Sequence, residues 1–317
     1  MSIMKSWNVC GAQEFFPGIS IAAVIVTYNR IDWLRKTLKA YESQTCLPDW
    51  VIVVNNCSND GTYDYLQEWE RSEHAFRVIV LNLETNLGGS GGFYYGIQKA
   101  METGSDWILI GDDDAIPDTD AVHILKDYVA SHDVGGISAV CTAVNNDGRN
   151  EGIHRCRLRK TPLGYIERYV PEGEYSADFT CDIYSFVGVM MKRSALELAG
   201  LPRKDFFIYN DDYEHSVRLA KTGKIICVPR AVFYHRDNLV YEKKATWRDY
   251  YATRNAVVMH STHFGKLYGA LRGLRRLAVA LTSRNPVKVR VICDGISDAY
   301  KGKLGISEKY YPGWKQK

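Results

Sequence analysis

Four short apolar segments recur in the first third of the chain, and each is followed by a polar corner. The segments lie at Ile19–Val26, Val51–Val54, Val78–Leu81 and Trp107–Ile110. Continuous, uncharged runs rich in β-branched residues are typical of strands that are buried on both faces of a parallel sheet. The stretches between them carry apolar residues at helical spacing, and Tyr63, Leu66 and Trp69 form one such face. This alternation predicts an α/β fold with a mostly parallel sheet flanked by helices.

The four corners are rich in Gly, Asn and Asp. In chain order they read TYNR, NNCSNDGT, NLGGSGG and GDDDA. In an open α/β sheet, ligands bind at the carboxyl ends of the strands. We therefore expect the four corners to meet in one crevice. Folding alone does not require polar residues in such number at the ends of four successive strands.

Beyond the fourth corner the pattern becomes mixed. We expect a helix at 118–131 and strands at Gly136–Val144 and Thr180–Met191. The polar stretch Asn145–Ala177 between these strands predicts loops and hairpins over the cleft. We next expect three elements: a helix near 194–199, a helix that begins in NDDYEHSVRLAKTG, and a short strand at Lys224–Val228. From Thr246 onward the chain is expected to be helical.

Charge is distributed unevenly along the 317 residues. The formal net charge of +3 is too small to indicate nucleic-acid binding. From Lys266 to Lys317 there are twelve Lys/Arg and three Asp/Glu, giving +9, which leaves −6 for the rest of the chain. The pattern predicts a basic C-terminal surface on a mildly acidic body.

An apolar stripe lies within this basic region. It recurs at helical spacing at Leu267, Leu271, Leu274, Ala278 and Leu281, next to Lys266, Arg272, Arg275 and Arg276. A basic amphipathic helix of this kind binds the surface of an anionic membrane, or it packs on the rest of the chain or on a second subunit. The pattern leaves these alternatives open, a homo-oligomer included.

The longest apolar runs are shorter than the roughly 18–20 residues that span a bilayer, and the N-terminus lacks a signal-peptide pattern. We therefore expect a cytoplasmic protein, with peripheral attachment to the inner face of the cell membrane as an open alternative.

Three adjacent carboxylates, Asp112, Asp113 and Asp114, directly follow the apolar segment WILIG. They repel one another at a strand end unless a cation or strong donors compensate them. Alternate residues of an extended segment point the same way, so Asp112 and Asp114 are expected to bind one divalent ion. Hard oxygen ligands suit Mg²⁺ or Mn²⁺, which would neutralise a departing diphosphate. An acidic turn before a helix is the alternative.

Three other features carry candidate chemistry. The glycine-rich segment Asn86–Phe93 opens a helix, where backbone N–H groups can approach an anion, or it is a structural turn. Asp211, Asp212 and Glu214 stand at a helix start, where they either cap the helix or supply a general base. His235 ends a strand in an aromatic context, and taken alone it is more typical of a structural histidine than of a ligand.

Taken in order, these motifs resemble glycosyltransferase family 2, which has the GT-A fold. The resemblance runs from about Ile21 to His235 and rests on AVIVTYNR, VIVVNNCSNDGT, NLETNLGGSGGF, WILIGDDDA, VGVMMKRSAL and FFIYNDDYEHSVR. It implies an enzyme that uses a nucleoside-diphosphate sugar donor and inverts the anomeric carbon. Together with the patterns above, the resemblance leads us to expect an N-terminal extension at 1–18, a catalytic domain at 19–240 with a donor half (19–117) and an acceptor half (118–240), and a helical basic region at 241–317.

The resemblance assigns roles to individual residues. Donor-binding residues would be Thr27, Asn29, Arg30, Asn55, Asn86, Gly88, Gly89 and Asp113. Asn55 stands where many relatives carry Asp. Asp112, Asp114 and His235 would hold Mg²⁺ or Mn²⁺. Asp212 would be the catalytic base, with Asp211 and Glu214 near the acceptor.

Within the family, the chain looks most like bacterial galactofuranosyltransferases, which implies UDP-galactofuranose as donor and a glycan or lipid-linked acceptor in cell-surface polysaccharide synthesis. A rhamnosyltransferase that uses a dTDP-sugar is the nearest alternative. The motif of processive synthases is absent, and WRDYY with TRN at 253–255 stands in the region where it would be sought. A nucleotidyltransferase lacks support because the first corner, TYNRIDW, is not a basic, glycine-rich phosphate loop. An inactive binding module remains as a rival, although Asp112, Asp114, Asp212 and His235 are all present.

Overall fold

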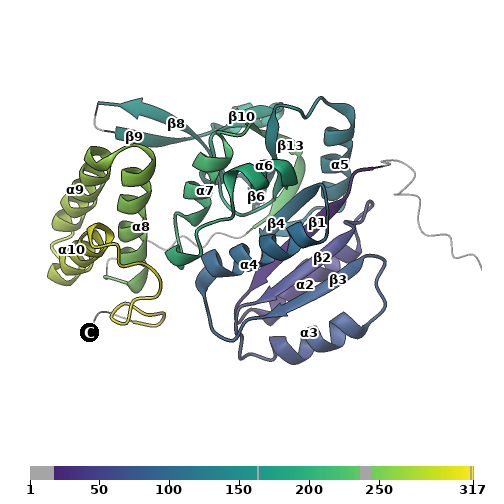
Figure 1. The fold of residues 1–317 in the computed structure, drawn as a ribbon, viewed down its shortest axis with the longest axis horizontal. Coiled ribbons are helices and arrows are strands. Elements are labelled where there is room, and N and C mark those ends of the chain that lie inside the picture. Colours follow the sequence, from purple (N-terminus) through teal and green to yellow (C-terminus); the bar gives the residue numbers. More distant parts are fainter. Residues whose placement is uncertain (1–17, 163, 236–243, 315, 317) are drawn as a thin grey trace, which may run out of the picture.

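The computed structural model describes residues 18–162, 164–235, 244–314 and 316, and its main body is a twisted sheet with helices on both faces (Figure 1). The expected N-terminal extension therefore lies almost entirely outside the described residues. The strands that form the donor half are β1 (Ile21–Thr27), β2 (Trp50–Asn55), β3 (Arg77–Asn82) and β4 (Trp107–Asp112). They pair in parallel in the order β3-β2-β1-β4, which confirms the predicted α/β fold.

The two faces of the sheet bury two separate cores. Ile21, Ala23 and Ile25 of β1 pack beneath the helices α2 (Ile31–Glu42), α3 (Thr62–Arg71) and α5 (Ala121–Ser131). The alternate residues Ala22, Val24 and Val26 pack against α4 (Gly88–Glu102) and α6 (Arg193–Ala199). Because successive strand residues point to opposite faces, an uninterrupted apolar strand is the expected sequence for this double burial. The prediction for Tyr63 was wrong: it was expected on the buried apolar face of α3, but it is exposed.

The acceptor half continues the same sheet with mixed directions. Its strands are β5 (Ile116–Pro117), β6 (Ile137–Asn146), β7 (Arg149–Asn150), β10 (Phe179–Cys181), β12 (Val189–Lys192) and β13 (Lys224–Tyr234), and β12 runs antiparallel to both β4 and β6. A second sheet joins β8 (Arg155–Thr161), β9 (Gly164–Tyr169) and β11 (Ile183–Tyr184). The expected loops and hairpins of 145–177 are therefore partly regular strands.

Two strand predictions for this half were wrong in extent. The expected strand Thr180–Met191 is three short strands, because β10 pairs with β13, β11 pairs with β8 in the second sheet, and the chain turns at Gly188 before β12. Gly188 has a φ of +61°, and a Cβ there would meet Oγ1 of Thr142 at 2.1 Å. The strand expected at Lys224–Val228 continues to Tyr234 across an irregularity between Val228 and Val232. This extension carries the chain to His235.

Three helices form the C-terminal lobe, at the left of Figure 1: α8 (Trp247–His263), α9 (Lys266–Thr282) and α10 (Pro286–Tyr300). Thr246 and Asp249 form a capping box that begins α8. Tyr250 and Tyr251 of α8 form a cluster with Val291 of α10 and with Phe207, which precedes α7 (Asp211–Leu219). The lobe is thereby attached to the loop before α7. No helix in the described ranges is long and apolar enough to cross a membrane.

Candidate active site

The four predicted corners do meet at one edge of the sheet, next to the point between β1 and β4 where the strand order reverses. Hydrogen bonds link them in pairs. The Thr27 hydroxyl donates to the Asp113 carboxylate at 2.7 Å, and the backbone N–H of Asn29 donates to the Ser58 hydroxyl at 3.0 Å. The Asn56 amide donates to the Asn86 side chain at 3.1 Å. Residues distant in sequence thus form one hydrogen-bonded polar region.

A possible metal cluster lies at the centre of this edge. Each of Asp112, Asp114 and His235 offers one ligand atom, and the three atoms lie within 4.8 Å of one another. Oδ1 of Asp114 is buried without a hydrogen-bond donor and lies 3.3 Å from Nε2 of His235. Two carboxylate oxygens and one imidazole nitrogen form a donor set that suits a divalent cation such as Mn²⁺. The residues present therefore fit the metal implied by the family resemblance.

The carboxylates of the cluster are unequally compensated by positive charge. Burial, and next the charge of Asp114, raise the pKa of Asp112 to about 8. Burial also opposes ionisation of Asp114, but contacts with His235 and Arg30 outweigh it and lower the pKa of that carboxyl. Arg30 donates to Asp113 at 3.1 Å and to Asp114 at 2.6 Å. Arg30 thus compensates the two later carboxylates, while Asp112 lacks an equivalent partner of its own among the described residues.

The route by which Asp112 and Asp114 come together differs from the prediction. The segment was expected to be extended, but β4 ends at Asp112 and the backbone then turns, with the N–H of Ala115 donating to the carbonyl of Asp112 at 3.1 Å. The turn is held by the N–H of Asp113, which donates to Val26, and by the Thr37 hydroxyl, which donates to the Asp113 carbonyl at 2.6 Å. A tight turn therefore places Asp114 beside Asp112.

A cavity of about 650 Å³ opens beside Asp114 and His235. Trp33 and Lys36 of α2 line it, together with the β6–β7 hairpin. Sequence reasoning missed these residues, and it also missed His154, whose ring lies edge-on to that of His235 at 5.5 Å between centroids. The signal for Trp33 and Lys36 was their position just after the first corner. His154 carries no such signal, because it lies far along the chain, in a short 3-10 helix at Gly152–His154.

The glycine-rich corner serves packing more than was expected. A Cβ on Gly92 or Gly96 would meet the side chains of Val26 and Val24 at 2.4 Å, so these glycines let α4 approach β1. Gly88 has a φ of +70° and packs against the backbone of Phe207. Gly89, in contrast, has open space at its Cβ position, so a ligand can approach its backbone. The donor-binding role of Gly88 and Gly89 stays a prediction.

Asn56 organises this corner and was not singled out from the sequence. Its amide group donates to Asn86 Oδ1 at 3.1 Å and to the Gly88 carbonyl at 2.9 Å, while its oxygen accepts from the N–H of Leu87 at 2.9 Å. Asn86 in turn accepts from the N–H of Gly88 at 2.8 Å. A single buried side chain thus fixes the backbone of the β3–α4 corner.

The carboxylate pair that begins α7 is electrostatically perturbed. Burial raises the pKa of Asp211, and burial together with the nearby charge of Asp211 raises the pKa of Asp212 to about 7. Oδ1 of Asp212 accepts the backbone N–H of Tyr213 at 2.7 Å, which orients the carboxylate. A general base works best when its pKa lies near the operating pH, so Asp212 has a suitable environment for that role.

Glu214 occupies a different position from its two neighbours. It is buried, and it accepts hydrogen bonds from Arg218 at 2.8 Å and from His263 of α8 at 2.9 Å. Burial opposes ionisation, but these two partners outweigh it and lower the pKa of Glu214 to about 2. The arrangement ties α7 to α8 and favours an orienting role, while direct contact of Glu214 with an acceptor stays a prediction.

The loop just before the carboxylate pair has an uncommon backbone. Phe207, Tyr209 and Asn210 all have positive φ values, between 63° and 68°. Such conformations cost free energy for residues other than glycine and persist where surrounding structure holds them. The side chain of Asn255, from α8, supplies much of this restraint. It donates to the carbonyls of Phe206, Ile208 and Tyr209 at 2.8 to 2.9 Å.

Arg254 reinforces the same restraint. It is also buried, and its guanidinium donates to the Phe206 carbonyl at 3.1 Å, to the Gly305 carbonyl at 2.7 Å and to the oxygen of Asn255 at 2.9 Å. The sequence singled out TRN at 253–255 only by its location. The structure gives it a structural explanation, since two adjacent helical residues fix the loop that places Asp211 and Asp212.

Asn255→Ala is expected to destabilise the protein, because it removes three hydrogen bonds: those of the two amide N–H groups, which the three loop carbonyls share, and the one that the amide oxygen accepts from Arg254. At about 1 kcal/mol for each bond, the free energy of unfolding should fall by about 3 kcal/mol. Denaturant unfolding followed by circular dichroism measures this change. Asn59→Ala, at an exposed position, is the matched control and should shift the free energy by less than about 0.5 kcal/mol. Equal stability of Asn255→Ala and the unmodified chain would contradict the restraint.

Comparison with known proteins identifies the family to which this architecture belongs. The galactofuranosyltransferase GlfT1 of Mycolicibacterium smegmatis is 29% identical over 210 residues, which cover 64% of this chain and 66% of that protein. Among solved structures, GalNAc-T7 with UDP, GalNAc and Mn²⁺ matches with a TM-score of 0.63 and 13% identity, over 89% of this chain and 56% of that one. The mannosyltransferase PcManGT from Pyrobaculum calidifontis, in complex with GDP-Man and Mn²⁺, matches with a TM-score of 0.54 and 16% identity, over 92% and 81% of the two chains.

These structural matches support the GT-A fold expected from the sequence. A model of the family described as "Glycosyl transferase family 2" matches residues 22–198, which include the four corners and end before Asp211 and His235. The match covers more than half of the chain, and the chain therefore belongs to glycosyl transferase family 2.

Proposed function

We propose that the protein is an inverting, metal-dependent glycosyltransferase that moves a sugar from a nucleotide-sugar donor to a hydroxyl group of an acceptor. The observation that carries this proposal is the cluster of Asp112, Asp114 and His235, whose ligand atoms lie within 4.8 Å of one another at the strand ends. Two structural relatives named above hold Mn²⁺ together with UDP or GDP-Man, which supports the same pairing of ion and nucleotide here.

The chain's own residues have separable tasks in this proposal. Asp112, Asp114 and His235 hold Mg²⁺ or Mn²⁺, and the ion supplies charge that stabilises the departing diphosphate. The imidazole ligand favours Mn²⁺ over Mg²⁺, which prefers oxygen ligands and retained water. Asp113 and Arg30 keep this strand end in position through their contact at 3.1 Å.

The donor's nucleoside half is proposed to contact Thr27, Asn29, Arg30 and Asn55. Supporting this, their corners are joined by hydrogen bonds, and Asn29 Oδ1 accepts the N–H of Asn59 at 2.7 Å. Asn55 already donates to Asn82 and accepts from the N–H of Ser58. A contact between Asn55 and the nucleotide base would therefore require one of these hydrogen bonds to break or to be shared with the base. Asn86 and Gly89 are proposed to lie beside the ribose and diphosphate.

Asp212 is proposed as the catalytic base, with Asp211 as the neighbour that tunes it. Inversion requires a base on the face opposite the leaving group, which takes the acceptor proton as the new bond forms. The raised pKa of Asp212 supports the assignment, since a carboxylate whose pKa is about 7 accepts a proton more readily than an ordinary one.

The proposed donor is UDP-galactofuranose, because the relative matched over most of the catalytic region is named a galactofuranosyltransferase. The proposed acceptor is a glycan or a lipid-linked glycan in cell-surface polysaccharide synthesis. A dTDP-rhamnose donor is the second candidate. A donor-hydrolysis screen over several nucleotide sugars, with and without Mn²⁺, tests these choices without an acceptor. Hydrolysis of none of them in the presence of Mn²⁺ would contradict the proposed activity.

The rate should depend on pH through the carboxylate pair. A base must be deprotonated to act, so the turnover rate is expected to be full above about pH 7 and to fall about tenfold for each pH unit below it. Because the charge of Asp211 raises the pKa of Asp212, Asp211→Asn should move this fall to lower pH. A pH–rate profile measures both effects, with the exposed Asp133→Asn as control. A flat profile between about pH 5 and 8 would contradict the assignment.

A further inference from the structure

Helix α9 turns three of its five leucines away from the rest of the described chain. Leu267, Leu274 and Leu281, which share one face at a spacing of seven residues, are 69%, 60% and 58% exposed. The opposite face carries small residues, and Gly269, Gly273 and Ala280 are buried there. Of the alternatives left open by the sequence, packing of the whole stripe on its own chain is therefore wrong for these three leucines.

The glycines explain why α9 is oriented in this way. A Cβ on Gly269 would lie 1.8 Å from the Ser261 hydroxyl and 3.0 Å from the carbonyl of Val257, both in α8. A Cβ on Gly273 would lie 3.4 Å from Val257 and Ile296, the latter in α10. Only the glycine face lets α9 approach its two neighbours so closely, and this leaves the leucine face outward.

Positive charge borders the exposed leucines. Helix α9 contains one lysine and three arginines and no acidic residue. Arg272 is paired with Glu167 at 2.9 Å, and burial lowers the pKa of Arg276. Arg275, in contrast, is exposed, and no ion pair links it to a carboxylate elsewhere in the part of the chain that the structure describes. Arg275 is thus the basic residue of this face best placed to meet an external anion.

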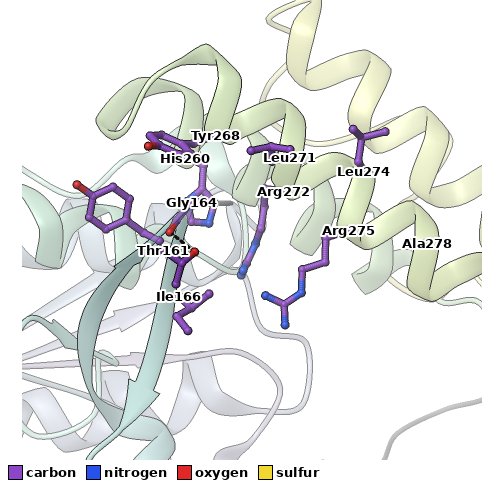
Figure 2. Close-up of a pocket in the computed structure, with 11 residues that line it drawn as sticks. Thr161, Gly164, Ile166, His260, Tyr268, Leu271, Arg272, Leu274, Arg275 and Ala278 are labelled. Carbon is purple, nitrogen blue, oxygen red and sulfur yellow. Dashed lines mark hydrogen bonds between the residues drawn. The ribbon is translucent and has the colours of Figure 1, made fainter.

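A groove of about 490 Å³ separates α9 from the β8–β9 hairpin, and Figure 2 shows its lining residues. Arg272 and Arg275 project from α9 on the same side, toward the hairpin (Figure 2). Leu271, Leu274 and Tyr268 supply apolar surface beside them. His260 also lines the groove; it is buried, and its Nδ1 has no hydrogen-bond partner in the described ranges. The groove thus combines apolar walls, cationic groups and a polar atom that lacks a partner.

We propose that the outer face of α9 and this groove dock on a bilayer that contains anionic phospholipids, with the leucines at the acyl boundary and Arg275 at a lipid phosphate. A basic amphipathic helix with an exposed apolar face is suited to the headgroup layer. A second copy of the chain fits less well, since a two-fold interface centred on Leu274, the middle of the exposed leucine face, would bring the neighbouring Arg275 close to its own counterpart. This proposal does not depend on the identity of the donor or the acceptor.

Vesicle co-sedimentation tests the docking surface. The full chain is mixed at low and high salt with phosphatidylcholine vesicles and with vesicles that also contain phosphatidylglycerol. Binding is expected only with the anionic vesicles and should weaken at high salt. Arg275→Glu changes two charges, and at about fivefold per charge it should weaken binding about 25-fold. Leu274→Ser should weaken binding about tenfold, because the variant loses an apolar side chain that the bilayer would otherwise bury.

Matched controls exist on other helices. Lys39→Glu makes the same charge change at an exposed lysine of α2, in the donor half at the right of Figure 1, and Leu198→Ser removes an exposed leucine from α6. Both controls should bind anionic vesicles like the unmodified chain. Hydrolysis of the nucleotide sugar should be unchanged in all four variants, which separates this test from that of the proposed activity.

Three results would overturn the proposal. The first is an unmodified chain that stays in the supernatant with anionic vesicles at low salt. The second is unchanged binding in both Arg275→Glu and Leu274→Ser. The third is a dimer in solution that becomes a monomer in Leu274→Ser without any vesicle binding, since that would assign the leucine face to a second copy of the chain.

Discussion

Asp114→Ala is expected to lower the rate of sugar transfer by about three to four orders of magnitude with little loss of stability. Asp114 contributes one of the three ligand atoms that lie within 4.8 Å, and it is the carboxylate whose Oδ1 is buried without a hydrogen-bond donor. If the bound ion supplies several kcal/mol of stabilisation to the departing diphosphate, each 1.36 kcal/mol lost costs a factor of about ten. The rate of transfer at saturating donor and Mn²⁺ measures the effect.

Two further measurements distinguish loss of the metal from loss of the fold. Mn²⁺ should raise the melting temperature of the unmodified chain and leave that of Asp114→Ala unchanged, because a ligand stabilises only the state that binds it. Glu73→Ala replaces an exposed carboxylate just after the end of α3, and it should retain both activity and the Mn²⁺ effect. Excess EDTA should abolish transfer, and Mn²⁺ or Mg²⁺ should restore it. Full activity in EDTA would rule out the metal assignment.

Asp212→Asn is expected to retain donor binding and to lose transfer by about 10²- to 10⁴-fold, the range typical of removing a general base. The substitution is conservative for the fold, because an asparagine oxygen can still accept the N–H of Tyr213, as Oδ1 of Asp212 does at 2.7 Å. Titration with the nucleotide sugar measures binding, and the rate of transfer measures catalysis. The two should separate in this variant.

Asp211→Asn is the decisive comparison for this assignment. Asp211 is buried at the same helix start, and its charge acts on Asp212. The Asp211→Asn variant should keep measurable transfer, and its rate should fall at a lower pH than that of the unmodified chain. If Asp211→Asn is inactive while Asp212→Asn transfers normally, the base lies one residue earlier than we propose.

Much of the donor half was predictable from local patterns. The apolar segments of the first four strands are long enough and uniform enough to identify strands buried on both faces, and β1, β2 and β4 are confirmed by their burial. The outcome for β3 differs, since its residues are mostly half-buried because it lies at the edge of the sheet. Its sequence, RVIVLN, does not reveal that position, which depends on the order of the strands.

That Asp112, Asp114 and His235 lie close together was only partly predictable from the sequence. Three consecutive aspartates after a strand indicate a cation site wherever the strand ends, because their repulsion requires compensation. The place of His235 came from the family resemblance, since a histidine at a strand end is not informative by itself. In the structure, β13 pairs with β5 and β6, and this pairing carries His235 to within 3.3 Å of Asp114.

By itself, the sequence determined which segments form the parallel strands, where the polar corners lie, and which carboxylates stand at strand and helix ends. Strand burial and helical spacing are local patterns, so they can be recognised without the rest of the chain. Only the tertiary structure decided that Asn255 holds the loop before Asp211, that His263 pairs with Glu214, and that α9 buries its glycines and exposes three of its five leucines. The physical reason is that such contacts depend on which surfaces approach one another closely. For α9, the sequence alone makes the leucine stripe as suited to burial as to exposure. The close approach of α8 and α10 to Gly269 and Gly273 decides that the glycine face is the buried one.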